Sequence, residues 1–236
     1  RRFTQKREWA QRSADIGYWR GIRALDADDL EQWAEAAPAG VVAWLGGQIG
    51  SRPRGVDDVA QHWNAISNAA SCELLPGVFL AGREQSVERV QQWLAAEPSR
   101  LAIDCRSPAE VIDFFCAAVA AMDEEERIAI ESRAIIVHEP DAWAVLRDTT
   151  VPAVLVVAPS LPLSNEEIGR AVANRHHVLD ATEPTILAGQ RDSELERASE
   201  FELTKALEES GYAPVKAEQF ARAAGGSLAI LKQRLA

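Results

Sequence analysis

The sequence predicts an α/β fold: a doubly wound, mostly parallel sheet with helices on both faces, preceded by a Trp-rich helical region and followed by a small helical lid. Four apolar runs carry this prediction, namely "RLAIDC", "RAIIVH", "PAVLVVAP" and "HHVLDA". Helical stretches alternate with them, at 109–122, 140–147 and 166–174. Near-continuous apolar strands that alternate with helices are typical of a parallel sheet covered on both faces. Right-handed crossovers then make the sheet doubly wound.

Composition limits the function classes. The 236 residues include 47% hydrophobic and 26% charged residues, enough for a large core, and carry a formal net charge of −11. Such an excess of acidic residues disfavours non-specific binding of nucleic acid, which needs clustered Lys and Arg. The amino-terminal end is nevertheless basic, with Arg1, Arg2, Lys6 and Arg7. A nucleic-acid-binding module is therefore an alternative, but a solvated helix face is favoured.

The cysteines and the apolar runs indicate a cytoplasmic protein. Cys72, Cys105 and Cys116 are scattered and odd in number, which suits a reducing compartment. We interpret Cys105 and Cys116 as core thiols, because they lie in or beside apolar runs. No run approaches the ~20 residues that cross a bilayer, so we expect no membrane partner. The sequence begins without Met, and we expect it to be a segment of a longer protein.

The first third is expected to be helical. Helices are predicted at 3–14 and 27–37, with a short strand "GYWRGIRALD" between them that ends at the helix cap Asp26. Further helices are predicted at 40–48 and 56–70.

Five tryptophans fall in this region: Trp9, Trp19, Trp33, Trp44 and Trp63. Aromatic residues at such spacing usually belong to a core, and less often to a surface that stacks bases or binds peptides.

A boundary is predicted near "SCELLPGVFLAGRE", which divides the chain into a helical region 1–75, an α/β core 76–190 and a helical lid 191–236. A short strand at 78–81 and a helix at 84–95 open the core. In the lid, a capping box from Ser199 to Glu202 begins one helix. Two more helices follow, at 215–224 and after Gly225-Gly226.

The turn after the predicted strand "RLAIDC" lacks a phosphate loop. The string GxxxxGK[ST], whose amides, Lys and hydroxyl hold phosphates and Mg²⁺, does not occur in the chain. Instead, Ser107 is expected to cap the next helix, with Pro108 at its first position and Glu110 folded back onto the cap. Asp104 adds a second negative charge, and Arg106 alone would have to offset both. A carboxylate thus takes the helix end that would favour a phosphate.

The order of parts nevertheless resembles the STAND and AAA+ class of P-loop NTPases over residues 78–236. The matching parts are "LAGREQSVERVQQWL", "RAIIVHEPDAW", "AVLVVAPS" and "ARAAGGSLAILKQRL". The resemblance implies a Gly-Arg box, a Walker B strand, a sensor strand and a helical lid with a Gly-rich turn. It places Arg83 near the nucleotide base, whereas an exposed or salt-bridged first-turn Arg is an equally good interpretation of that residue.

The Walker B position departs from the family in the same way. His138 stands where the metal-holding Asp would be, and Glu139 where the water-activating acid would be. His138 could ligate a softer metal, but a lone His at a strand end is more often structural. The adjacent His176 and His177 point to opposite faces of a strand and cannot share one metal without distortion.

A second resemblance concerns residues 1–40. "REWAQRSADIGYWRGIRALDADDLEQWAEAAP" resembles the closing strand and helix of an Mrr-type restriction-nuclease domain, whose catalytic residues would precede Arg1. The resemblance implies a parent protein that joins a nuclease to this module, as in bacterial defence against phage.

These observations predict a non-catalytic regulatory or scaffolding module of a cytoplasmic bacterial protein, whose partner is another protein or a neighbouring domain. We expect no catalytic residues, no metal and no cofactor. The first alternative is a nucleotide-binding NTPase in which Arg83, Arg106, Ser107 and the lid hold ATP with Mg²⁺. A small-molecule enzyme with a pocket at Asp104, His138 and Ser160 is a further alternative, since open α/β sheets place sites at the carboxyl ends of strands.

Overall fold

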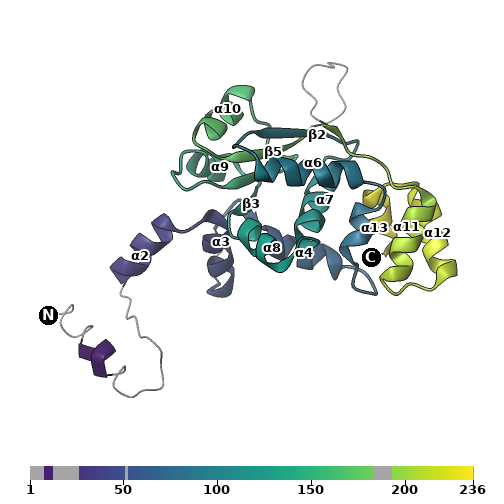
Figure 1. The fold of residues 1–236 in the computed structure, drawn as a ribbon, viewed down its shortest axis with the longest axis horizontal. Coiled ribbons are helices and arrows are strands. Elements are labelled where there is room, and N and C mark those ends of the chain that lie inside the picture. The colour runs from purple at the N-terminus through teal and green to yellow at the C-terminus, as the bar shows by residue number, and fades with distance from the viewer. Residues whose placement is uncertain (1–7, 13–26, 51–52, 183–192, 236) are drawn as a thin grey trace. The chain divides into compact units, whose positions relative to one another are not determined.

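The computed structural model describes residues 8–12, 27–50, 53–182 and 193–235 (Figure 1). The chain divides into two compact units, Arg1–Ala37 and Pro38–Ala236. The described part of the first unit is helical at 8–12 and in α2, Ala27–Ala36. The predicted strand "GYWRGIRALD", with Trp19 and the cap Asp26, lies outside the described residues.

The second unit is built on a sheet whose described strands number six, in the order β1-β3-β4-β5-β2-β6. The strands are β1 (Val56–Asp58), β2 (Arg100–Asp104), β3 (Ala134–Val137), β4 (Val154–Val157), β5 (His177–Thr182) and β6 (Ser193–Glu194). All neighbours pair in parallel except β1, which runs antiparallel along β3. The four apolar runs form β2 to β5, and the predicted α/β fold is confirmed.

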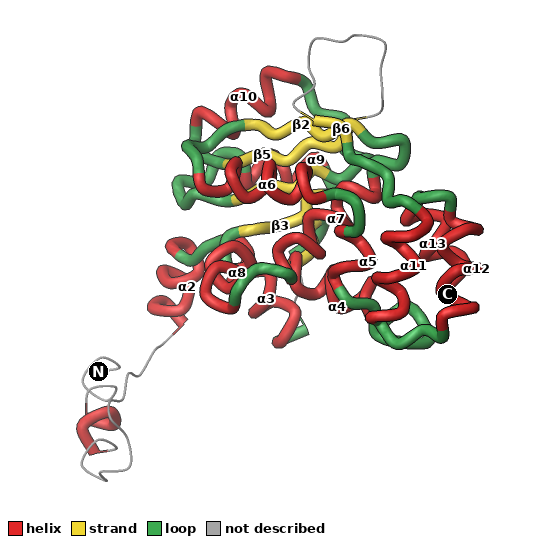
Figure 2. The backbone as a smooth tube through the Cα atoms, turned by 45° about the vertical axis from the view of Figure 1, so that its right-hand side comes forward, coloured by secondary structure: helices red, strands yellow, loops and turns green. Residues whose placement is uncertain are grey.

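The connections make the sheet doubly wound (Figure 2). From β2 the chain passes through α7 (Ala109–Ala120) and α8 (Glu124–Glu131) to β3, three positions away. It then returns stepwise through α9 (Pro140–Leu146) to β4 and through α10 (Asn165–Ala173) to β5. Right-handed crossovers in opposite directions place α7 on one face and α9 and α10 on the other.

Two hydrophobic clusters confirm this winding. Phe114 of α7 packs in one cluster with Ile103 and Val156, whereas Trp143 of α9 packs in another with Leu155. Since Leu155 and Val156 are neighbours on β4, the two clusters lie on opposite faces of the sheet. Helix α6 (Glu84–Ala95) covers the same face as α7, and α3 (Ala39–Gln48) the same face as α9.

The last three helices, α11 (Glu200–Glu209), α12 (Pro214–Ala224) and α13 (Leu228–Leu235), gather at one end of the unit (Figure 1). The predicted capping box is confirmed: the Glu202 N–H donates to Ser199 Oγ at 3.2 Å, and the Ser199 N–H donates to Glu202 Oε2 at 2.9 Å. Helix α12 ends at Gly225, whose φ of 56° suits glycine. Leucines of α11 and α13 share a cluster with Phe79 and with Ala117 of α7.

The predicted strand at 78–81 is wrong, because Pro76–Leu80 forms the short helix α5. Its buried Val78 and Phe79 pack into the cluster of the C-terminal helices. A short apolar run does not distinguish a strand from a buried helix. Pro76 at the first helical position was the signal that favoured a helix.

The predicted helix at 56–70 is also corrected at its start. Residues 56–58 form β1, and α4 extends over Val59–Ser67. Asp58 caps α4, since its Oδ1 accepts a hydrogen bond from the Gln61 N–H at 2.9 Å. The pairing of β1 with β3 depends on a strand far along the chain, so the local sequence did not reveal it.

The division of the chain therefore differs from the predicted boundary at residues 75 and 76. β1 belongs to the sheet, α4 contributes Val59 to the core, and α3 contributes Ala43. The division between the two compact units instead falls between Ala37 and Pro38 in the sequence.

The tryptophans do not form one core. Trp9, Trp33 and Trp44 are exposed, which contradicts the core interpretation for these three. Trp63 is partly buried and meets Phe79 edge to face, with ring centroids 5.4 Å apart. No helix in the described ranges is both long and apolar enough to cross a membrane.

His177 is the buried group that should make stability depend on pH. Its ring lies edge to face against Trp93, with centroids 5.0 Å apart. Burial lowers the pKa of His177 from 6.5 to about 4, and the charge of Arg133 acts in the same direction. Between these two values the unfolded chain binds a proton that the folded chain does not. The contribution of His177 to stability is therefore complete above about pH 6.5 and is lost as the pH falls toward 4.

We predict that His177→Phe flattens this dependence, because Phe keeps the ring against Trp93 and cannot take up a proton. Between neutral pH and about pH 5, the free energy of unfolding of the unaltered protein should fall by about 2 kcal/mol more than that of the variant. Urea denaturation at a series of pH values measures this difference. His176, whose pKa burial also lowers, stays in both proteins and cancels. Parallel pH profiles of the two proteins would refute the assignment to His177.

Candidate functional site at the start of α7

The turn between β2 and α7 is closed by its own backbone. Pro108 is the cap residue of α7, and no side chain caps this end, so the prediction that Ser107 and Glu110 form a cap is wrong. Pro108 already has helical dihedral angles (φ −54°, ψ −28°), which leaves Ser107 one residue too far from the helix. The carbonyl of Ser107, rather than its hydroxyl, accepts the Glu110 N–H at 2.8 Å.

Several amides at this end bond within the chain. The Val111 N–H donates to the Pro108 carbonyl at 3.1 Å, and the backbone of Ser107 bonds the thiol of Cys105. A phosphate loop instead turns consecutive amides toward its ligand.

Burial raises the pKa of Cys105 and, more strongly, that of Cys116. Both thiols belong to the core, as expected.

The side chain of Glu110 turns away from its own helix end and reaches α13. Its carboxylate is buried, and Oε1 accepts hydrogen bonds from Ser227 Oγ at 2.8 Å and from the Ala229 N–H at 3.0 Å. Ser227 precedes α13, and Ala229 is in its first turn. A carboxylate at a helix amino terminus satisfies free N–H groups and is favoured by the helix dipole.

Arg83 supplies the opposite charge. It is 1% exposed, and its Nη2 lies 3.4 Å from Glu110 Oε2. Its Nε donates to the Glu196 carbonyl at 2.9 Å, and its Nη1 to the Phe79 carbonyl at 3.0 Å. Burial lowers the pKa of Arg83, and the charge of Glu110 opposes that shift. All three guanidinium nitrogens thus bond groups of the chain itself.

A second carboxylate lies one turn further along α7. Asp113 is 3% exposed, with Oδ2 2.6 Å from Nζ of Lys232 on α13 and Oδ1 2.9 Å from Nε2 of His62 on α4. Glu110 and Asp113 are three residues apart and so share a face of the helix. We call the set Arg83, Glu110, Asp113, Ser227 and Lys232 the α7–α13 junction.

Sequence reasoning did not identify this junction. The signal in the sequence was the presence of two acidic residues, Glu110 and Asp113, in the otherwise apolar stretch "AEVIDFFCAAVA". A helix that is apolar on all sides is buried, and acidic side chains on it then need partners within the protein.

The three residues predicted to bind a nucleotide lie in different environments. Arg83 is buried, Ser107 is partly buried and Arg106 is exposed. Across the described ranges, no hydrogen bond or ion pair joins their side chains to one another.

His138 and Glu139 have structural roles, and Ser160 lies on the surface. The backbone N–H of His138 donates to the Gly55 carbonyl at 2.8 Å, and the ring Nε2 of His138 lies 2.8 Å from Asp57 Oδ2, so this residue links the end of β3 to the segment of β1. Glu139 is the cap residue of α9, and Ser160 is exposed. In the part of the chain that the structure describes, no group of three or more His, Cys, Asp or Glu could hold a metal ion.

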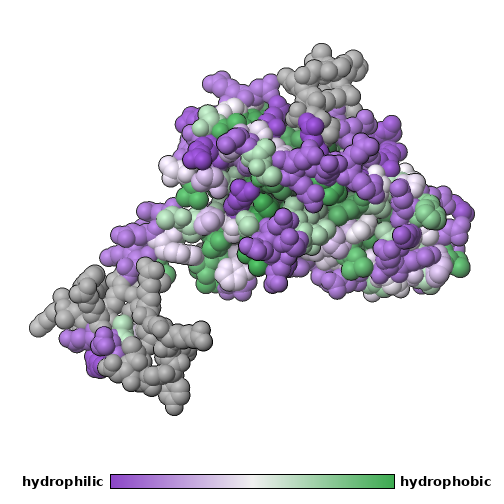
Figure 3. Space-filling view, viewed as in Figure 1, coloured by the Kyte–Doolittle hydropathy of each residue, from purple (hydrophilic) through white to green (hydrophobic). Residues whose placement is uncertain are grey.

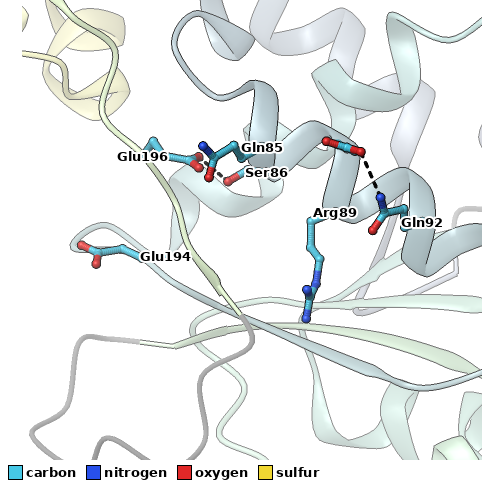
Figure 4. A pocket seen from close by; sticks show the side chains of 7 residues that line it. Gln85, Ser86, Arg89, Gln92, Glu194 and Glu196 are labelled. Carbon is cyan, nitrogen blue, oxygen red and sulfur yellow. Dashed lines mark hydrogen bonds between the residues drawn. The ribbon is translucent and has the colours of Figure 1, made fainter.

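A polar cavity of about 630 Å³ lies between α6 and β6 (Figure 4). It is lined by Gln85, Ser86, Glu88, Arg89, Gln92, Glu194 and Glu196. Ser86 Oγ bonds Glu196 Oε2, and Arg89 extends toward the strands, away from both Glu194 and Glu196. Ser86 is the single hydroxyl residue of this lining and its partner is a carboxylate; the lining includes no His, Cys or Lys, so it lacks the Ser–His or Cys–His pair of the common nucleophilic sites.

Comparison of the chain with protein-family models, with curated proteins and with solved structures gives no match. The interpretation of the α7–α13 junction therefore depends on its own geometry.

We predict that Glu110→Gln destabilises the protein by about 3 kcal/mol or more, because it keeps the shape of the side chain but leaves Arg83 buried without a counter-charge. Urea denaturation measures the loss. Compared with the unaltered protein, the variant should show a larger increase of hydrogen exchange in α13 than in β3 or β4, because α13 loses its charged partner.

The matched control is Glu88→Gln, which neutralises an exposed carboxylate on α6 and should change stability by no more than about 0.5 kcal/mol. Equal effects of the two substitutions would show that the buried pair contributes no special stability.

Proposed function

We propose that this chain is a non-catalytic regulatory or scaffolding module of a larger protein, which couples neighbouring domains or binds a protein partner. One observation carries the proposal. At the first turn of α7, the buried carboxylate of Glu110 is held by Arg83 and by the start of α13. The position that a nucleotide phosphate would need thus serves to attach the C-terminal helices to the sheet.

The electrostatics of this turn support the proposal. A phosphate near the first turn of α7 would meet the charge of Glu110, and the charge of Arg83 is already committed to that carboxylate. The dipole of α13 also acts on Glu110 rather than on an external anion. A ligand anion would therefore have to displace internal contacts before it gained any of its own.

The wider setting belongs to the proposal as well. The order of parts supports a degenerate STAND or AAA+ core, in which the helical lid has kept its place although the nucleotide motifs are missing. We place the parent protein in the bacterial cytoplasm, with a role in defence against phage. The C-terminal helices are attached to α7 through the carboxylates of Glu110 and Asp113. This supports a coupling role, because ion pairs and hydrogen bonds of this kind can be exchanged for others in a conformational change.

A nucleotide-binding NTPase is the second candidate, and the exposure of Arg106 favours it. Arg106 follows the carboxyl end of β2, where ligands bind in open α/β sheets, and it has no ion pair within the described residues. The nucleic-acid alternative depends on the basic residues 1–7, which lie outside the described part of the chain.

Titration calorimetry with ATP, ADP and GTP in the presence of Mg²⁺ separates these candidates. We predict no heat of binding from the folded protein, because amides at the start of α7 and the charge of Arg83 are committed to the chain itself. Arg106→Ala is the matched variant. Heat that disappears in Arg106→Ala would overturn the non-catalytic proposal and favour the NTPase.

A further inference from the structure

The C-terminal helices carry a groove between α11 and α12 with two exposed apolar side chains. Phe201 is 78% exposed and Val215 is 67% exposed, each near the start of its helix. Together with Thr204 and Pro214 they line a groove of about 460 Å³. Figure 3 shows hydrophobic patches among hydrophilic side chains over these helices.

Phe201 and Val215 are not needed to build the helices. The core faces of α11 and α12 are formed by other residues, such as Leu203, Leu207 and Ala221, which are buried. The helix starts are set by the capping box of Ser199 and by Pro214 at the first position of α12. Apolar side chains that gather in one exposed groove, rather than singly on the surface, favour an interaction surface.

The charged residues that line the groove are all acidic: Glu200, Glu208 and Glu218. Arg222 bonds Glu200 at 3.1 Å and Glu218 at 2.7 Å, so three carboxylates against one guanidinium leave a net charge of −2. Glu208 has no side-chain partner among the described residues. The groove thus combines exposed apolar side chains with a net negative charge.

We propose that this groove binds a short segment of a partner protein in which a large apolar side chain stands next to Lys or Arg. The apolar side chain would pack against Phe201 and Val215, and the basic residue would pair with Glu208. A second copy of the chain fits poorly, because both copies would bring the same acidic rim and a net charge of −11. This inference rests on the proposed role in binding a protein partner, and it adds the surface and the chemistry of that partner.

The test is selection of short random peptides, displayed on phage, against the whole chain. We expect the enriched peptides to contain Leu, Ile, Phe or Trp beside Lys or Arg. Fluorescence anisotropy of the strongest peptide should then show that Phe201→Ser weakens binding about tenfold or more. Glu208→Lys should weaken it as well, because it reverses the charge that meets the basic residue.

The matched control is Val145→Ser, which removes a side chain that is 69% exposed on α9, away from the groove. It should leave the affinity unchanged, and circular dichroism should show all variants folded. The inference is overturned if no peptide is enriched, if the enriched peptides are acidic, or if Phe201→Ser binds like Val145→Ser. It is also overturned if sedimentation shows a dimer that Phe201→Ser dissociates, because the occupant is then a second copy.

The outcome is separable from that of the calorimetry. If the selection fails and no nucleotide binds, the proposal for the groove is wrong, whereas the proposed coupling role of the α7–α13 junction stands. Nucleotide binding overturns the non-catalytic proposal whatever the peptides do.

Discussion

The buried ion pair between Arg83 and Glu110 is the constraint on which the rest of the second unit depends. Removing two charges from water is costly, and the cost is offset only when every donor and lone pair finds a partner. Here two carbonyls, a hydroxyl and a helix amide complete the pair. These partners come from α5, from the segment before α11 and from α13, so the pair can form only when all of these segments are in place.

The place of β2 in the sheet explains why such a pair is needed. β2 lies between β5 and β6, and α7, which follows it, has buried residues at every position from Glu110 to Val119. A helix buried on all sides has no solvated face for an acid, so Glu110 and Asp113 must be satisfied from within. Both carboxylates face α13, and the same contacts that neutralise α7 also hold the C-terminal helices.

Local sequence patterns predicted the parts of this fold that depend on neighbouring residues. The apolar runs gave β2 to β5, and the Ser199 capping box gave the start of α11, because each signal is complete within a few residues. β1 and the partners of Arg83 depend on segments that are distant in sequence, and no local pattern encodes them. Ser107 was mistaken for a cap because its spacing to Glu110 fits a capping box, whereas the long-range contacts of Glu110 decided its orientation.

These contacts also set what the start of α7 can do. A helix amino terminus attracts anions, and in this protein the carboxylate of the first turn serves another helix, α13, instead of a ligand. An anion that approached would compete with Glu110 for Arg83, and Glu110 is also the residue that holds the start of α13. The contacts that take up the carboxylate of Glu110 and the charge of Arg83 thus attach α13 to α7, and the strength of this attachment depends on charge.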